Sequence, residues 1–290
     1  MRTLVTGSAG FIGRHLTAAL SDLGHDVTGV DIVDGRDALN LFRHDDTRFD
    51  LVAHCAAVEP HRSAIDASPL TVGAGCLELD AAMFQWALRT GPGRVVYFSS
   101  SAAYPVALQQ PGLAVKLEED HIDLDRPEQP DAIYGWLKLT GEHLAASYRQ
   151  HGGVVTVLRP FSGYAEDQGE RFPFGAFQAR ANRREDPFVI WGDGTQTRDW
   201  IHVSDIVGAV LAAWEYGVDG PVNLGTGRAT SMTDLAKLFT AEAGYSPSFD
   251  YRPDAPSGVA YRVCDPSRLL GFYEPRVSIE EGVRLACRSR

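Results

Sequence analysis

Short apolar segments alternate with longer helical patterns through the first half of the chain, and this alternation constrains its fold more than any other feature. Runs typical of buried strands cover 3–6, 25–31, 49–57, 93–101 and 153–161. Strands that alternate with helices in this way build a parallel sheet with helices on both faces. We therefore predict an α/β, doubly wound parallel sheet over residues 1–160, with returning segments near 190–228. A smaller α/β region is predicted over 161–290.

Composition narrows the function. The 290 residues are 44% hydrophobic, which is ample for a large core. The formal net charge of −11 argues against nucleic acid or an anionic membrane as a partner. The chain has no apolar run near the ~20 residues of a membrane span and enters a strand at once, so we expect a cytoplasmic protein without a signal peptide. Its four scattered cysteines show no metal-ligand spacing, so no metal site is expected.

A glycine pattern lies between the first strand and the first helix. Gly7, Gly10 and Gly13 form G-x-x-G-x-x-G, which allows a tight turn, a close pyrophosphate and close helix–strand packing. The alternative is a simple strand–helix turn. Asp31 ends the second strand, 18 residues after the last glycine, where a carboxylate accepts hydrogen bonds from an adenosine ribose. Because that carboxylate would repel a 2′-phosphate, the pattern predicts NAD rather than NADP.

The segment YGWLK places Tyr134 four residues before Lys138, on one face of a predicted helix over 132–150. The alternative is a surface pair in which the lysine stem covers the ring. The SSS run at 99–101 ends a central strand, and ligands bind at the carboxyl ends of such strands. A nearby lysine lowers the pKa of a phenol. Together these residues predict hydride transfer, in which Tyr134 moves a proton and Lys138 holds the ribose.

Several further segments, taken with these, resemble one family over nearly the whole chain. They are GSAGFIGRHL, VAHCAAV, VVYFSSSAAYP, YGWLK, LRPFSGY, WGDGTQTRDWIHVSDIVGA, VNLGTG and YRPDAPSGVAYRVCDPSR. The chain resembles the extended short-chain dehydrogenases/reductases, in particular the NAD-dependent nucleotide-sugar epimerase/dehydratase family. The resemblance implies a Rossmann-type fold, bound NAD and a nucleotide-diphosphate sugar as substrate. It also implies a homodimer formed through the helices at 74–90 and 132–150.

The resemblance also assigns residues. The catalytic residues it implies are Ser100, Tyr134 and Lys138, with Ser101 as the nearest alternative to Ser100. The cofactor-binding residues it implies are Gly7, Gly10, Phe11, Ile12, Gly13, Asp31, Ala56, Ala57, Ser99, Tyr134, Lys138 and Pro160. The substrate-binding residues it implies are Ser100, Ser162, Arg198 and Arg252, with Arg262 as the alternative to Arg252.

The sequence departs from the family at several positions. Thr71 and Ser162 replace asparagines, Pro105 replaces a glycine, and the adenine-contacting aspartate of the family is assigned to Asp37. The acidic pair of family dehydratases is missing, because Ser101 and Ala102 follow Ser100. Elimination of water needs an acid and a base near the leaving group, so we predict a 4-epimerase that works through a 4-keto sugar.

Two alternatives to the epimerase remain open. One is an NAD(P)H-dependent reductase of a 4-keto nucleotide sugar, and the other is a non-catalytic NAD-binding protein. Five other positions are assigned supporting roles: His54 as a packed core histidine, Asp199 as a turn residue, and Glu59, His61 and Arg62 as a solvated loop near the sugar. The polar stretch 105–131 is predicted to be a long loop and a candidate lid.

Overall fold

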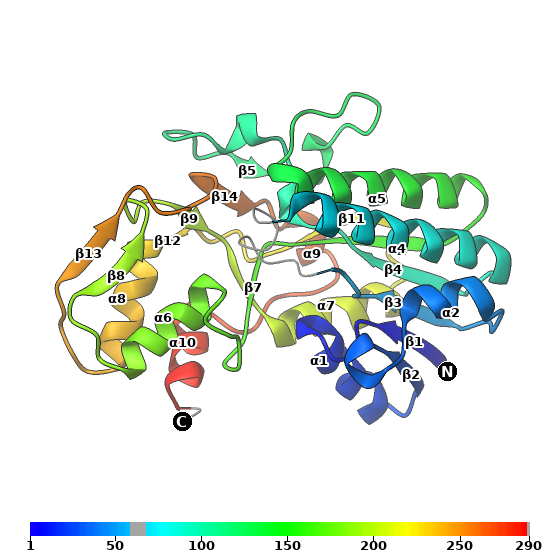
Figure 1. Cartoon of the computed structure of the whole chain (residues 1–290), viewed down its shortest axis with the longest axis horizontal. Helices are drawn as coiled ribbons and strands as arrows, with labels where there is room; N and C mark the ends of the chain where they lie inside the picture. Colours follow the sequence, from blue (N-terminus) through cyan, green and yellow to red (C-terminus); the bar gives the residue numbers. More distant parts are fainter. Residues whose placement is uncertain (59–67, 289–290) are drawn as a thin grey trace.

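The computed structural model describes residues 1–58 and 68–288. Its centre is a six-stranded sheet in the order β2–β1–β3–β4–β6–β11, in which all neighbours are parallel (Figure 1). The strands are β1 (Arg2–Thr6), β2 (Asp26–Val30), β3 (Leu51–His54), β4 (Arg94–Phe98), β6 (Val155–Pro160) and β11 (Gly220–Leu224). The predicted parallel α/β fold is therefore confirmed. β11 comes from the later half of the chain and joins the sheet beside β6.

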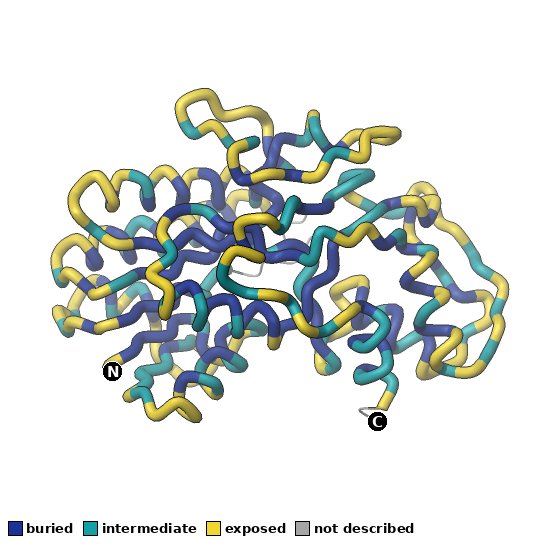
Figure 2. Tube along the Cα trace, turned by 180° about the vertical axis from the view of Figure 1, so that it is seen from behind, coloured by how far each residue is buried: buried dark blue, intermediate teal, exposed yellow. Residues whose placement is uncertain are grey.

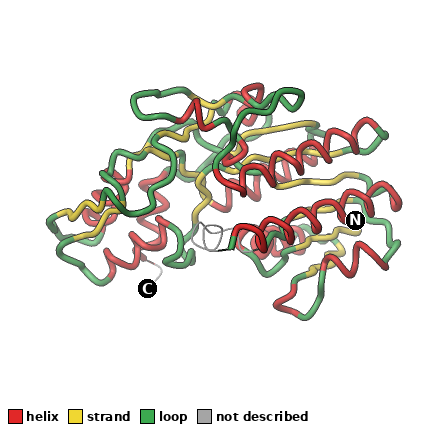
Figure 3. Tube along the Cα trace, turned by 45° about the horizontal axis from the view of Figure 1, so that its top comes forward, coloured by secondary structure: helices red, strands yellow, loops and turns green. Residues whose placement is uncertain are grey.

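Helices cover both faces of this sheet. On one face α4 (Pro69–Thr90) packs between α2 (Ala38–His44) and α5 (Ala132–Gln150), and Figures 1 and 3 show α4 and α5 side by side. On the other face α1 (Phe11–Asp22) packs against α7 (Val203–Glu215). Because side chains alternate along a strand, Leu4 of β1 joins the core under α4 and α5, whereas Val5 joins the core under α1 and α7. Each face of the sheet therefore has its own apolar core.

The chain between β2 and β3 is short and forms no further strand of this sheet. It contains a 3₁₀ turn, η1 (Ile32–Asp34), followed by α2. Asp31 caps η1 through the N–H of Val33, and Asp37 caps α2 through the N–H of Leu39. Such side-chain caps satisfy N–H groups that a helix cannot pair internally. β2 is consequently the edge of the sheet.

The C-terminal region forms its own layer around a third core, at the left of Figure 1. Its helices are α6 (Pro173–Asn182), α8 (Met232–Glu242) and α10 (Ile279–Arg288), and α9 (Ser267–Leu270) lies nearer the main sheet. α8 begins at Ser231, whose side chain accepts a hydrogen bond from the N–H of Asp234. β8 (Phe188–Trp191) pairs with β13 (Phe249–Arg252), and β7 (Ser162–Tyr164) pairs with β10 (Trp200–His202).

A small four-stranded sheet connects the two regions. Its order is β12 (Thr230–Ser231), β9 (Thr197–Arg198), β14 (Tyr261–Cys264) and β5 (Lys116–Leu117). β5 belongs to the polar stretch 105–131, which also forms η3 (Val106–Gln109) and η4 (Glu119–His121), after η2 (Ser101–Ala103). Most of this stretch is exposed (Figure 2), but β5 fastens it to β14. It is therefore partly structured and not simply a long loop.

Candidate active site

The glycine loop between β1 and α1 is shaped by close backbone contacts. Gly7 has a φ of +69°, and a Cβ there would lie 2.7 Å from the backbone of Ala56. A Cβ on Gly13 would collide with the carbonyl oxygen of Gly7. α1 begins after Gly10 without a side-chain cap and without an acidic residue in its first turn. Its first N–H groups and positive dipole end therefore suit a pyrophosphate, so the residues fit a dinucleotide.

Asp31 lies at the carboxyl end of β2, beside this loop. Its carboxylate accepts hydrogen bonds from the N–H of Ala9 and the N–H of Val33, each at 3.0 Å. A carboxylate has about four lone-pair sites, so both oxygens retain capacity for ribose hydroxyls. The side chain of Asp37 is used by the N–H of Leu39, at 2.9 Å. Its contact with adenine stays a prediction.

The loop geometry predicts a large effect of adding one methyl group at Gly13. We expect Gly13→Ala to lower NAD affinity at least about tenfold and to cost about 1–3 kcal/mol of stability, as overpacking does. Bound NAD and urea unfolding measure the two effects. Gly169→Ala is the matched control, because a Cβ at Gly169 meets open space. Equal NAD affinity in both variants would contradict a cofactor loop at this place.

Ser100, Tyr134 and Lys138 come from two elements but lie together. Ser100 follows β4 and caps η2 through the N–H of Ala102, at 3.1 Å. Its side chain lies close enough to Tyr134 on α5 to lower the pKa of the phenol. The Lys138 Nζ lies 5.9 Å from the centre of the Tyr134 ring. The nearest alternative, Ser101, is buried inside η2.

The electrostatics of this cluster differ from the simple expectation that lysine lowers the pKa of the tyrosine. Burial raises the pKa of Tyr134, and Lys138 and Ser100 lower it by less, so the net pKa lies above the usual value. Burial lowers the pKa of Lys138, but the carboxylate of Asp80 and other neighbours raise it by more. In the protein alone, the phenol is therefore protonated and the lysine is charged at neutral pH.

The segment after β3 joins the two ends of the site. Ala56 lies against Gly7, and Ala57 and Tyr134 both pack against the cluster of Val72, Cys76 and Leu137. The glycine loop and the tyrosine therefore face a common segment of backbone. Phe11 lies near Gly163, Ile12 packs into the core under α1, and Pro160 ends β6. Glu59, His61 and Arg62 lie outside the described residues.

Ser99 is held by a buried ion pair that the sequence analysis missed. Its hydroxyl donates to Glu142 at 2.5 Å, and Glu142 accepts two hydrogen bonds from Arg159, at 2.9 and 2.6 Å. Arg159 also donates to the hydroxyl of Tyr104, at 3.0 Å. The signal was a charged residue inside the apolar strand VTVLRP, because a buried arginine needs an anionic partner. The predicted contact of Ser99 with the cofactor stays a prediction.

The substrate-side residues fall into two places. Arg198 on β9 pairs in register with Arg262 on β14. Burial and the charge of Arg262 lower the pKa of Arg198 to about 9, so it is still a cation at neutral pH. Arg252 is not brought to them: it lies on β13, 60% exposed, in an ion pair with Asp250. Arg262 itself donates to Gln109 and to Asp131, the residue directly before α5.

Three further predictions can be compared with the structure. Ser162 opens β7, and its N–H donates to the carbonyl of Asp199, so it lies next to Arg198. The Asp199 carboxylate accepts from the N–H groups of Thr226 and Gly227, at 2.8 Å each, which confirms its supporting role. His54 is buried and hydrogen-bonded, as a core histidine should be.

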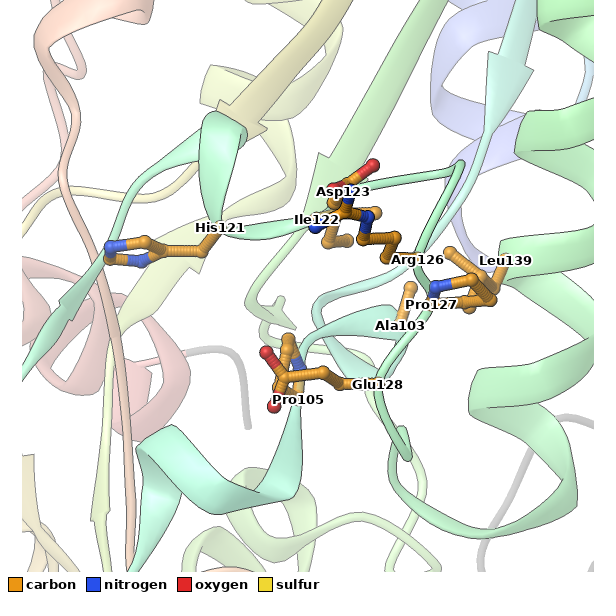
Figure 4. Close-up of a pocket in the computed structure, with 9 residues that line it drawn as sticks. All are labelled: Ala103, Pro105, His121, Ile122, Asp123, Arg126, Pro127, Glu128 and Leu139. Atoms are coloured by element: carbon orange, nitrogen blue, oxygen red, sulfur yellow. The ribbon is translucent and has the colours of Figure 1, made fainter.

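The stretch 105–131 lies over the segment that follows Ser100. A cavity of about 20 Å³ lies between Ala103, Pro105, Leu139 and residues 121–128 (Figure 4). This volume holds about one water molecule and no sugar. The described part of the chain holds no cluster of three or more His, Cys, Asp or Glu side chains suited to a metal ion. Within the same residues, every helix is too short or too polar to span a bilayer.

Comparison with known proteins gives a consistent result. Residues 3–225 match the profile of the NAD dependent epimerase/dehydratase family. UDP-glucuronic acid decarboxylase 2 of Arabidopsis thaliana is 30% identical over 98% of this chain and 67% of its own length. A dTDP-4-dehydro-6-deoxy-D-allose reductase of a Streptomyces species is 28% identical over 97% of this chain and 94% of its own.

The fold agrees with that of a solved structure as well. The UDP-glucose 4-epimerase of Thermotoga maritima, solved with UDP-glucose, superposes with a TM-score of 0.83 at 27% identity, over 99% of this chain and 97% of its own. The matched family covers most of the chain, from β1 to the end of the main sheet at β11. The chain therefore belongs to the NAD-dependent epimerase/dehydratase family.

Proposed function

We propose that this protein is an NAD-dependent nucleotide-sugar epimerase that inverts C4 through a transient 4-keto sugar. The observation that carries the proposal is the cluster of Ser100, Tyr134 and Lys138, which faces the same backbone segment as the glycine loop. It is the constellation needed to move a proton and a hydride at one carbon. Family membership and the likeness to a UDP-glucose 4-epimerase support the same reaction.

The residues of the chain divide the chemistry as follows. Ser100 holds the 4-oxygen of the sugar, and Tyr134 removes the hydroxyl proton and later returns it. When bound, NAD⁺ supplies the hydride acceptor and a positive charge close to the phenol. That charge matters because burial raises the pKa of Tyr134 more than Lys138 lowers it. Lys138 contributes its own cation and a hydrogen-bond donor for the ribose.

The diphosphate of the substrate is assigned to Arg198 together with Arg262. The two guanidinium groups lie on neighbouring strands, close enough that the charge of Arg262 lowers the pKa of Arg198. Arg262 already pairs with Asp131 at 2.9 Å, so a diphosphate would above all supply the anion that Arg198 needs. Arg252, the residue first implied by the family pattern, is exposed and paired with Asp250. We therefore prefer Arg262, which was its alternative.

This assignment predicts a clear split among three matched variants. Arg198→Met and Arg262→Met should raise KM for the nucleotide sugar about ten- to a hundredfold, because a hydrogen bond to a charged group contributes about 1.5–3 kcal/mol. Arg252→Met should leave KM within about twofold, since exposed ion pairs contribute little. The opposite order, with Arg252 affecting KM and Arg262 neutral, would show the assignment to be wrong.

The second candidate is a reductase of a 4-keto nucleotide sugar. Two observations favour it: the similarity to the Streptomyces reductase and the raised pKa of Tyr134, which suits a proton donor to a ketone. Dehydration is disfavoured, because the buried turn of Ser101 and Ala102 puts no acid or base beside Ser100.

A homodimer is proposed as the working unit. α4 and α5 pack together and leave apolar side chains exposed, among them Leu77, Ile133 and Trp136. An exposed apolar patch on adjacent helices is a common mark of a protein interface. A monomeric mass in sedimentation equilibrium at micromolar concentration would contradict this proposal.

The decisive experiment is ¹H NMR of the purified protein with UDP-, dTDP- and GDP-sugars and no added cofactor. Interconversion of two sugars without net redox would support the epimerase and identify the substrate. If no sugar of the panel changes, and NADH is then consumed with a 4-keto nucleotide sugar, the reductase would replace the epimerase as the proposed function. If NAD binds and neither reaction occurs, the result would support the non-catalytic NAD-binding protein.

A further inference from the structure

Three neighbouring strands each present one buried polar side chain at the same level. Thr6 of β1 pairs in register with His54 of β3, and His54 pairs in register with Tyr97 of β4. All three side chains are essentially inaccessible to solvent. A buried row of polar side chains is costly unless its hydrogen bonds are satisfied.

Asp80 of α4 lies over this row and completes it. His54 Nε2 lies 3.2 Å from one Asp80 carboxylate oxygen, and the Tyr97 hydroxyl donates to the other at 2.6 Å. Thr6 Oγ1 lies 2.7 Å from His54 Nδ1. An ionised carboxylate can only accept, so His54 donates to Asp80 from Nε2. The four residues form one continuous chain of hydrogen bonds.

α5 is built to lie against this chain. A Cβ on Gly141 would collide with the Tyr97 hydroxyl and lie 3.0 Å from Asp80 Oδ2. Lys138 stands three residues earlier on the same helix, with its Nζ 5.2 Å from the centre of the Tyr97 ring. Gly141 therefore allows the Asp80–Tyr97 pair to approach α5 beside the catalytic lysine.

Lys138 is 4% exposed and Asp80 is 2% exposed, so each charge needs the other. The groups that act electrostatically on Lys138 are Asp80, Tyr134, Cys76 and Cys55. Burial raises the pKa of both thiols, that of Cys55 to about 12, and also that of Tyr134, so these three are neutral at pH 7. Burial raises the pKa of Asp80 too, but Lys138 and the hydrogen bonds lower that pKa by more than burial raises it. Asp80 is therefore the anion of the set.

We propose that Asp80 is a positioning residue, held by Thr6, His54 and Tyr97, that keeps Lys138 cationic and fixed beside Tyr134. The proposal rests on the proposed role of Lys138 in hydride transfer. It also links the two ends of the site, because Thr6 directly precedes Gly7 of the glycine loop. Asp80 acts through Lys138 and needs no contact with substrate.

The chain offers a direct test, since its lysines are only Lys116, Lys138 and Lys237. ¹³Cε-lysine NMR therefore gives three signals, which Lys116→Arg and Lys237→Arg assign. In the wild-type protein, Lys138 should titrate above the two exposed lysines. In Asp80→Asn, its midpoint should fall by more than about one pH unit, because burial is then uncompensated. Asp80→Glu should restore most of the shift.

Glu78→Gln is the matched control: it removes an exposed carboxylate from the same helix and should leave the Lys138 midpoint unchanged. An unchanged midpoint in Asp80→Asn would overturn the proposal. If that variant does not fold, the wild-type titration decides, and a Lys138 midpoint below those of Lys116 and Lys237 would overturn it equally. The titration needs no turnover, so it still judges Asp80 if the proposed reaction proves wrong.

Activity provides an independent readout. The loss of kcat in Asp80→Asn should grow as the pH rises, because Lys138 then loses its proton at a lower pH than in the wild type. KM for the sugar should stay near the wild-type value, since Asp80 lies away from Arg198 and Arg262. A kcat loss that is equal at every pH would indicate a merely structural role and contradict the proposal.

Discussion

Tyr134→Phe is expected to lower kcat about a thousandfold while leaving the amount of bound NAD unchanged. An epimerisation uses the phenol twice, to remove the proton of the hydroxyl and to return it. A positioned acid or base typically contributes about 10²- to 10⁴-fold to a rate. The substitution removes only the phenol oxygen and keeps the ring, which packs against Val72, Cys76 and Leu137. Turnover by NMR and NAD released on denaturation measure the two effects.

Tyr148→Phe is the matched control for this substitution. Tyr148 lies on the same helix, about 21 Å along its axis from Tyr134, and its ring packs in the core against Phe84. It should keep near-normal turnover. If Tyr134→Phe also did so, the proposed chemistry would fail for the epimerase and the reductase alike, since both use the phenol for proton transfer.

The parts of the site that were predictable are those with a local spacing rule. Tyr134 and Lys138 meet because i and i+4 share a helix face. The glycine loop can be predicted from the sequence because a strand, three glycines and a helix follow one another directly. Ser100 and Tyr134 are 34 residues apart in sequence, yet the rule that ligands bind at the carboxyl ends of parallel strands brought them together.

The pairing of Arg198 with Arg262 was harder to predict from the sequence, because it depends on strand register. Arg198 lies on the two-residue strand β9, and Arg262 on the four-residue strand β14. Strands this short carry too little alternation to fix their pairing. The sequence therefore left Arg252 and Arg262 as alternatives. Only the parallel pairing of β9 with β14 places Arg262 beside Arg198 and leaves Arg252 on a different strand pair.

The buried hydrogen-bond networks of Asp80 and Glu142 could not be predicted from the sequence, for a different reason. Asp80 and Glu142 look like ordinary charged residues on long helices, and a single helix does not reveal what its inner face meets. Both face polar side chains on β-strands: Asp80 meets His54 and Tyr97, and Glu142 meets Arg159. Charged residues inside apolar strands were the available signal. The same burial explains why the pKa of Tyr134 is raised, which a reading of the lysine alone could not show.

The Glu142–Arg159 pair carries the second large prediction. Glu142→Gln should lower the free energy of unfolding by about 3–5 kcal/mol, because it leaves a buried guanidinium without its anion. The two side chains are only 3% and 2% exposed, and their nearest atoms are 2.6 Å apart. Urea unfolding gives the magnitude. Arg149→Met is the control, since Arg149 lies on the same helix as Glu142 in an exposed pair with Asp219 and should cost less than about 1 kcal/mol.

A double variant separates charge from packing. Glu142→Met combined with Arg159→Met removes both charges at once, so it should recover much of the stability lost in either single variant. It should not recover full activity, because Ser99 loses the acceptor that holds it next to Ser100. If Glu142→Gln proved as mild as Arg149→Met, the pair would not be the buried support of the serine strand. If the double variant lost as much free energy of unfolding as the two single variants combined, the unpaired charge would not explain the instability of the single variants.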